Sequence, residues 1–206
     1  VERLESLADE IRETTDAAVS VVPTDVTDSD AVRALVDATV ERFGSLDIVV
    51  CNAGLGIDKS VAELTDEEYR LMTGVNVDGM FYTAREAIPH LEESEGNLVF
   101  LGSMSGNHPR PHNPVYAATK WWVRGFAHSV AAQVGDDGVA VSVVNPSEVR
   151  TEFGSEDGEP FEERFEPGSV TEPAEVAEAI AFAASRPGST AQEIDLFRRD
   201  KFADAL

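Results

Sequence analysis

Ser103, Tyr116 and Lys120 are the residues whose types and spacing could do chemistry in this chain. Tyr116 and Lys120 stand four positions apart, so on a helix they lie on one face, with an ammonium beside a phenol. A free phenol has a pKa of about 10 and exchanges protons poorly near pH 7 until a cation lowers that value. A hydroxyl at a nearby strand end, such as that of Ser103, could hold a reacting oxygen during the proton exchange. These residues predict proton transfer to or from a bound oxygen.

Apolar runs of strand length alternate with helical patterns, which predicts one domain with a parallel sheet between two layers of helices. We expect strands at residues 18–22, 46–51, 97–102, 139–144 and 193–197. We expect helices at residues 1–14, 29–44, 65–90, 114–134 and 171–184, the third with a bend at Gly74 and an end marked by Pro89. This order places Ser103 just after a strand, and Tyr116 and Lys120 on the helix that follows. Residues 152–170 show no clear helical or strand-like spacing of apolar residues.

Three further segments accompany these residues. They are C-N-A-G at 51–54, N-V-D-G at 76–79 and N-P-S-E-V-R-T at 145–151. Together with Ser103 and the Y-x-x-x-K pair, they make the chain similar to the short-chain dehydrogenase/reductase family from about residue 25 to about residue 199. The resemblance implies a Rossmann-like, doubly wound α/β fold. It also implies an NAD(P)-dependent oxidoreductase that interconverts an alcohol and a carbonyl by hydride transfer.

The resemblance assigns roles around the reacting oxygen. Tyr116 would be the general acid/base, and Lys120 would lower the pKa of its phenol and bind the nicotinamide ribose. Ser103 would bind the substrate oxygen, a role for which Ser105 is the rival. Asn76 would order a water through its backbone as part of a proton relay. The alternative for Asn76 is a helix-interior amide that only satisfies neighbouring backbone groups.

Cofactor-binding residues are likewise implied by the resemblance. They are Asn52, Ala53 and Gly54 beside the ribose, Asp25 and Val26 at the adenine, Tyr116 and Lys120, and Pro146, Val149 and Thr151 at the nicotinamide. A stray aspartate at position 25 is the alternative in so acidic a chain. Ser147 stands where the family usually has glycine, and a serine allows fewer backbone conformations in that turn. NADP is slightly favoured over NAD because residues 2–7 resemble a subgroup that holds the 2′-phosphate with arginines just upstream.

Folds of this kind hold the pyrophosphate on a glycine-rich turn after the first strand. The glycines at 54, 56, 102 and 106 follow later strands instead. We therefore expect about forty further residues ahead of Val1, which would carry the first β-α-β segment and the phosphate turn. The alternative is a rearranged sheet that binds no cofactor.

The chain is strongly acidic, with 39 Asp and Glu against 16 Lys and Arg, a net charge of −23 and a pI near 4.3. Self-repulsion of this size destabilises a compact state at low ionic strength. In about 1 M salt the Debye length falls to about 3 Å and the repulsion largely vanishes. The surface therefore predicts adaptation to a salt-rich cytoplasm, as in halophilic microbes. Nucleic acid and anionic membranes are poor partners, because no basic patch could meet phosphate.

Membrane insertion is not expected either, since no apolar run approaches the roughly 20 residues that a transmembrane helix needs. The one cysteine, Cys51, excludes an internal disulfide and predicts a buried, inert thiol, which fits a reducing cytoplasm. His108 and His112 are separated by prolines that prevent a helix, so we expect no metal site there. We interpret the acidic run at 156–166 as part of a solvated lid. The apolar wall of a substrate pocket would come from Phe153, Phe161 and Phe165.

Two other functions remain open. A dinucleotide-binding scaffold without turnover is the alternative from another class, and the complete set of catalytic residues argues against it. An epimerase or dehydratase of the extended branch would carry an added substrate domain, which the short C-terminal part does not supply. We also expect a homodimer or homotetramer, because the helix from Pro114 shows more apolar surface, at Trp121, Trp122 and Phe126, than one core-facing stripe requires.

Overall fold

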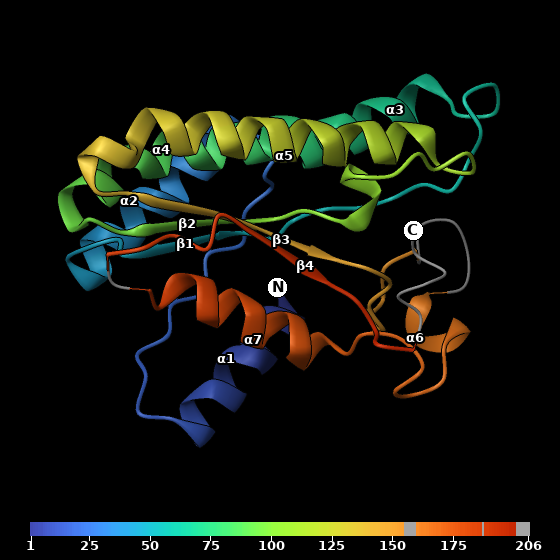
Figure 1. Ribbon diagram of the computed structural model, residues 1–206. Helices are drawn as coiled ribbons and strands as arrows, with labels where there is room; N and C mark the ends of the chain where they lie inside the picture. The colour runs from blue at the N-terminus through green and yellow to red at the C-terminus, as the bar shows by residue number, and fades with distance from the viewer. Residues whose placement is uncertain (155–159, 187, 201–206) are drawn as a thin grey trace.

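The computed structural model describes residues 1–154, 160–186 and 188–200. Its centre is a parallel sheet whose described strands lie in the order β1-β2-β3-β4 (Figure 1). The strands are β1 (Ile48–Cys51), β2 (Asn97–Leu101), β3 (Ala140–Pro146) and β4 (Glu193–Leu196). In this register Phe100 pairs with Cys51 on one side and with Val143 on the other. Because the strands are parallel, their carboxyl ends meet at one edge of the sheet, where a site can form.

Helices cover both faces of the sheet, which confirms the three-layer α/β class predicted from the sequence (Figure 1). One face carries α2 (Ser29–Phe43), α3 (Asp66–Thr73), α4 (Gly79–Ser94) and α5 (Pro114–Val134). The other face carries α1 (Glu2–Thr14) and α7 (Pro173–Ala184), and α6 (Phe161–Arg164) is a single turn near the carboxyl ends of the strands. In the part of the chain that the structure describes, no helix has the length and apolar character needed to span a membrane.

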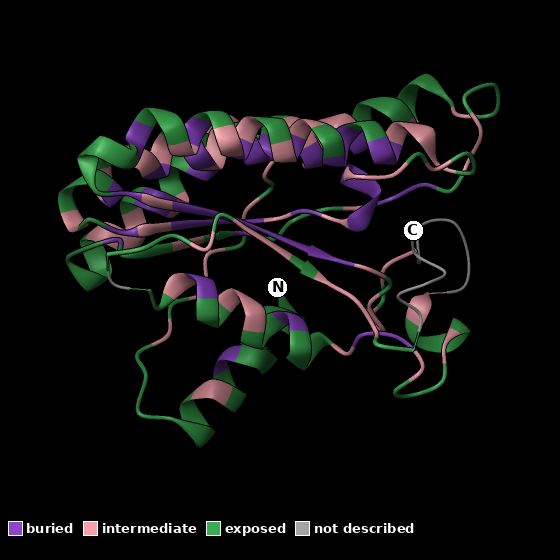
Figure 2. Ribbon diagram, viewed as in Figure 1, coloured by how far each residue is buried: buried purple, intermediate pink, exposed green. Residues whose placement is uncertain are grey.

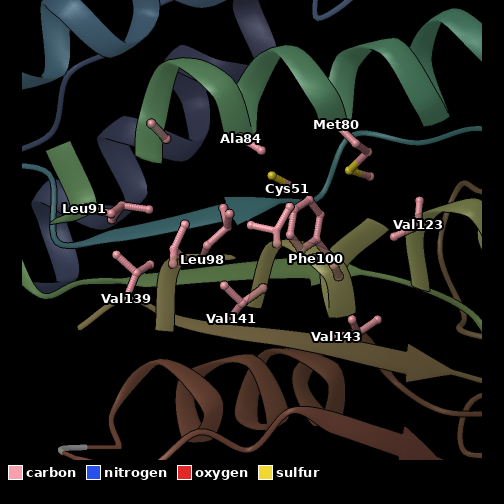
Figure 3. Packing of buried hydrophobic residues seen from close by; sticks show 14 of the residues in the cluster. Cys51, Met80, Ala84, Leu91, Leu98, Phe100, Val123, Val139, Val141 and Val143 are labelled. Atoms are coloured by element: carbon pink, nitrogen blue, oxygen red, sulfur yellow. The ribbon is translucent and has the colours of Figure 1, made fainter. Parts of the chain in front are cut away.

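The main core lies between the sheet and helices α4 and α5 (Figure 3). Phe100 and Val143 from the strands meet Met80 and Leu91 of α4 and Val123 of α5, and all five are buried. Burying one such side chain contributes about 1.5–3 kcal/mol. Figure 2 shows this buried layer continuing along the inner faces of the helices. The core therefore fixes α5, the helix that carries Tyr116 and Lys120, against the sheet.

Local signals place several of the helix ends where the sequence predicts them. The carboxylate of Asp28 accepts hydrogen bonds from backbone N–H groups at the start of α2, and Gly44 ends that helix with φ of 89°. Thr65 and Glu68 form the predicted capping box at the start of α3. Pro114 occupies the first turn of α5, which runs to Val134 as predicted.

The prediction of a strand at residues 18–22 is wrong, because this segment pairs with no strand in the structure. A strand requires a neighbouring ladder, and among the described residues β1 pairs with β2 alone. The expectation of a fully buried strand at 46–51 is wrong for one face, since Ile48 is 49% and Val50 40% exposed. The opposite face of β1 packs into the main core and buries Cys51, as predicted.

The helix end expected near Pro89 is also wrong, because α4 continues to Ser94. Proline inside a helix removes one backbone hydrogen bond and normally ends the helix. Here the next turn is held by Leu91, which is fully buried in the core, and the helix ends with Glu95 at φ 49°. The bend expected at Gly74 coincides with a π-helical turn, Gly74–Asp78, between α3 and α4. Such turns are frequent at functional sites.

The acidic segment after β3 begins with a well-connected loop. The backbone of Arg150 donates to the carbonyl of Thr171 at 2.9 Å, and the backbone of Thr171 donates to the carbonyl of Glu148 at 3.1 Å. Phe161 opens the short helix α6, which the sequence pattern did not indicate. Residues 155–159, part of the acidic run interpreted as a lid, lie outside the described residues. Backbone hydrogen bonds thus hold the start of this segment, at Glu148 and Arg150, to Thr171 at its end.

Candidate active site

The end of β2 and the start of α5 bring Ser103, Tyr116 and Lys120 together. Ser103 follows β2, and its hydroxyl accepts a hydrogen bond from the backbone of Ser105 at 3.1 Å, which holds the side chain at the strand end. Tyr116 lies in the first turn of α5, and the Ser103 hydroxyl forms a hydrogen bond that lowers the pKa of its phenol. Lys120 lies one turn later and donates to the carbonyl of Leu101 at 2.9 Å. Serine, phenol and ammonium therefore surround one point at the carboxyl edge of the sheet.

Tyr116 is held in an apolar environment and is only 8% exposed. Ile57 and Met72 pack with it in a small cluster, and the ring of Phe153 lies 5.6 Å from the Tyr116 ring, centroid to centroid. Burial raises the pKa of Tyr116 to about 12, against smaller lowering effects of Ser103 and of the Arg110 charge. The phenol is thus protonated at neutral pH.

Lys120 was expected to be the group that lowers this pKa, and the structure gives that effect to Ser103 and Arg110 instead. With a pKa near 8, Lys120 has lost its charge before a phenol with a pKa near 12 titrates, so it does not lower that value. The Lys120 ammonium lies 5.8 Å from the centre of the Tyr116 ring and is directed at the carbonyl of Leu101. Burial lowers the pKa of Lys120 itself to about 8, so most of this side chain is still charged at pH 7.

The surroundings of Lys120 fit a bound dinucleotide. An ammonium has three N–H donors, and among the described residues one of them is used, toward Leu101. A methyl group added at Gly54 would lie 3.5 Å from the Lys120 ammonium and 3.4 Å from the side-chain oxygen of Asn76. Glycine at this position therefore leaves space beside the Lys120 ammonium for a ligand atom. A buried cation with unused donors suits the hydroxyl groups of a ribose.

Asn76 lies in the π-helical turn, fully buried, and its side chain joins two segments. Its side-chain oxygen accepts from the backbone N–H of Leu55 at 3.0 Å, and its amide nitrogen donates to the Leu55 carbonyl at 2.8 Å. The same nitrogen donates to the hydroxyl of Thr119 at 3.1 Å, next to Lys120 on α5. Asn76 thus fixes the loop after β1 against α5. Thr119, which makes this link, was missed by the sequence reasoning.

The other residues expected at the cofactor lie at the end of β3, in the loops after β1 and β3, and in the segment before α2. Asn52 and Ala53 follow β1 and are exposed. Asp25 is exposed too, and its carboxylate accepts from the backbone and the hydroxyl of Thr27 at 2.9 and 2.8 Å, which lowers its pKa. Val26 packs against Gly79 at the start of α4, so this pair is fixed to the helix layer although residues 18–22 form no strand.

The loop after β3 carries Pro146, Val149 and Thr151. Ser147, the departure from glycine, keeps a negative φ, and its N–H donates to the Leu196 carbonyl at 2.9 Å, so this turn does not need a glycine. The Thr151 hydroxyl accepts from the backbone of Phe153 at 3.2 Å. This hydrogen bond holds the loop beside the Phe153 ring, which packs against Tyr116.

Arg110 is a residue near the phenol to which sequence reasoning gave no role. It lies between Pro109 and Pro111 in the segment that joins Ser103 to Tyr116, and its charge lowers the pKa of Tyr116. A signal was present in the sequence, since it is the one cation between Ser103 and Tyr116.

The three phenylalanines proposed for an apolar wall form a chain of rings. Phe153 contacts Phe161 with centroids 5.5 Å apart, and Phe161 contacts Phe165 at 5.4 Å. Phe153 is the member that reaches Tyr116. Across the described ranges, no three metal-ligating side chains gather around His108 or His112, or elsewhere.

Comparison with known proteins agrees with this geometry. A family model described as short chain dehydrogenase matches residues 1–160. Meso-2,3-butanediol dehydrogenase from Serratia marcescens is 32% identical over 195 residues, which cover 89% of this chain and 78% of that protein.

Solved structures with the same arrangement include two with a bound dinucleotide. An alcohol dehydrogenase from the archaeon Thermococcus sibiricus, complexed with 5-hydroxy-NADP, superimposes with a TM-score of 0.87 at 29% identity and covers 95% of this chain and 81% of its own. A 3-ketoacyl-(acyl-carrier-protein) reductase from Brucella melitensis, complexed with NADH, gives a TM-score of 0.80 at 30% identity, with coverage of 93% and 81%. The chain belongs to the short-chain dehydrogenase family of NAD(P)-dependent oxidoreductases.

Proposed function

We propose that Tyr116 transfers the proton while the chain interconverts an alcohol and a carbonyl compound. The observation that carries this proposal is the position of the Ser103 hydroxyl beside a phenol that is protonated at neutral pH. In the direction of reduction, the phenol donates its proton to the developing alkoxide, and Ser103 holds that oxygen by a hydrogen bond. In the direction of oxidation, the phenolate accepts the proton of the alcohol.

A nicotinamide dinucleotide would supply the hydride in reduction and accept it in oxidation. Lys120 would bind its ribose through the donors that the Leu101 carbonyl leaves unused. The other residues that would hold it are Asn52, Ala53 and Gly54 near the ribose, Asp25 and Val26 at the adenine, Tyr116, and Pro146, Val149 and Thr151 at the nicotinamide. We favour NADP slightly over NAD because residues 2–7 resemble a subgroup that holds the 2′-phosphate with arginines just upstream; the similar solved structures hold an NADP derivative in one case and NADH in another.

Asn76 would combine a positioning role with the proposed relay. Its side chain is committed to Leu55 and Thr119, so the backbone of the π-helical turn is the part that would order a water near Lys120. Proton exchange between Lys120 and solvent is helped by a pKa near 8, because both protonation states are then accessible at neutral to mildly basic pH.

We also propose that the protein works as a homodimer or homotetramer in a salt-rich cytoplasm. Phe81 of α4 and Trp121 of α5 are 40% and 48% exposed, so both leave apolar ring surface in contact with solvent. The net charge of −23 favours high ionic strength, where the repulsion between two copies is screened. Light scattering in molar salt tests this, since a mass of a single 22.2 kDa chain would contradict it.

A spectrophotometric assay of nicotinamide oxidation tests the proposed function. The protein is assayed in molar salt with NADPH and with NADH against a panel of aldehydes, ketones and oxo acids. We expect cofactor consumption that depends on the carbonyl compound. Tight dinucleotide binding without turnover of any compound would instead support the non-catalytic scaffold.

A further inference from the structure

Arg110 is held on a stiff segment at the active site. Pro109 and Pro111 on either side fix their own φ angles, and a residue before proline is confined to extended backbone. The Arg110 carbonyl also accepts from the backbone of Asn113 at 3.3 Å, just before α5 begins. The side chain of Arg110 therefore starts from a defined position beside the catalytic helix.

The Arg110 guanidinium lacks the partner that arginines in this chain usually have. Most of the other arginines form ion pairs with carboxylates, which is unsurprising among 39 acidic residues. Arg110 forms neither an ion pair nor a hydrogen bond through its side chain among the described residues, and its Nε is buried. A buried N–H without an acceptor is unfavourable, and a guanidinium carries five donors and no acceptor. Arg110 thus keeps a buried N–H without an acceptor, on the segment that joins Ser103 to Tyr116.

We propose that Arg110 binds a carboxylate of the substrate, so that the enzyme acts on short hydroxy acids and the corresponding oxo acids. This inference rests on the proposed function, because it names the substrate class of the same site. The planar fork of a guanidinium matches a carboxylate with two parallel hydrogen bonds. The effect of the Arg110 charge on the Tyr116 phenol supports the placement, since it locates the guanidinium within electrostatic reach of the reacting oxygen.

The acidity of the chain makes such a direct contact necessary for an anionic substrate. A protein with a net charge of −23 repels anions at a distance, and in about 1 M salt a Debye length of about 3 Å removes long-range attraction as well. Only a cation in contact with the carboxylate can then recognise it. In the reaction the carbonyl carbon gains a hydride and its oxygen gains the Tyr116 proton, while the carboxylate stays unchanged.

Matched substrates separate this inference from the proposed function. The probes are acetoacetate and 2-oxobutanoate, each compared with its methyl ester, which has the same carbonyl and no charge. In molar salt we expect the wild-type protein to reduce the acids with the higher kcat/KM. Arg110→Met should lower kcat/KM for the acids by about 10- to 100-fold and lower the values for the esters much less, only through the lost effect of its charge on the pKa of Tyr116. Arg110→Lys should recover part of the loss, because it restores the charge without the fork.

Arg42→Met, which removes an arginine on α2 outside the site, is the control and should leave all four substrates unchanged. Thermal unfolding of each variant shows whether it folds, and the acid-to-ester ratio remains informative even if Arg110→Met loses total activity. Reduction of esters but not acids, or an equal loss on both in Arg110→Met, would overturn the inference and leave the proposed function standing. Failure of the wild-type protein to reduce any carbonyl compound, with the dinucleotide bound, would overturn both.

Discussion

The ammonium of Lys120 donates a hydrogen bond of 2.9 Å to the carbonyl oxygen of Leu101, the last residue of β2. This bond joins α5 to the strand that ends just before Ser103. It crosses a buried environment, and burial lowers the pKa of Lys120 to about 8 from 10.5. The buried position of the Lys120 ammonium is therefore also the reason why its protonated form is unfavourable in the folded state.

Lys120 should give the folding stability a distinct pH dependence. Its folded pKa lies near 8, below the 10.5 of the unfolded chain, so the unfolded chain binds the extra proton between these values. Stability contributed by this group should therefore rise with pH from about 8 to about 10.5, by up to about 1.4 kcal/mol per pH unit. Lys120→Met should remove that rise. Denaturant unfolding of both proteins across this range measures the difference, and parallel pH profiles would contradict the expectation.

Asn76→Ala should destabilise the protein strongly. The Asn76 side chain is fully buried and satisfies both backbone groups of Leu55 and the hydroxyl of Thr119. Leaving those groups unpaired should lower the free energy of unfolding by about 2–4 kcal/mol. Asn113→Ala, at a helix cap without a side-chain hydrogen bond, is the matched control and should cost less than about 1 kcal/mol. Equal losses in the two variants would show that the Asn76 contacts contribute little.

Phe153→Ala should lower the pKa of Tyr116 from about 12 toward 10. Burial is the largest cause of the raised pKa, and the Phe153 ring covers the Tyr116 ring at 5.6 Å. Tyrosinate absorbance during alkaline titration reports the change, because the chain has three tyrosines and Tyr116→Phe identifies the relevant one. Phe161→Ala is the control. Among the described residues, that ring contacts Phe153 and not Tyr116, so its removal should change the pKa of Tyr116 less. A titration identical to wild type would mean that Phe153 does not bury the phenol.

Arg124 and Glu193 should show coupled contributions to stability. Arg124, one turn after Lys120, donates to both carboxylate oxygens of Glu193 at 2.6 and 3.1 Å, and Asn145 donates to the same carboxylate at 3.0 Å. A double-mutant cycle with Arg124→Met and Glu193→Gln should give a coupling of about 1 kcal/mol, because both side chains are partly shielded from solvent. The exposed pair Arg12 and Asp9 should give a value near zero in molar salt. Equal couplings for the two pairs would contradict this expectation.

Much of the site could be predicted because its signals are local. The i, i+4 spacing of Tyr116 and Lys120, and Pro114 in the first helical turn, describe one continuous helix, and the structure places that helix as predicted. Thr65 and Glu68 form a capping box within four residues for the same reason. A local signal needs no knowledge of what packs against it.

The errors concern features that depend on distant partners. The segment at 18–22 has the composition of a strand, but a strand forms only beside a ladder, and β1 pairs with β2 alone among described residues. Pro89 signals a helix end locally, yet burial of Leu91 keeps the helix intact. The influence of Arg110 on Tyr116 depends on how the connecting segment folds back.

The most direct measurement of the central claim is the single-turnover rate of Tyr116→Phe on the carbonyl compound that the wild-type protein reduces fastest. The variant keeps the ring and its packing against Phe153 and loses only the proton donor. We expect the rate to fall by about 10²- to 10⁴-fold, while the dissociation constant of the dinucleotide stays within about 3-fold of wild type. A wild-type rate in this variant would contradict proton transfer by Tyr116.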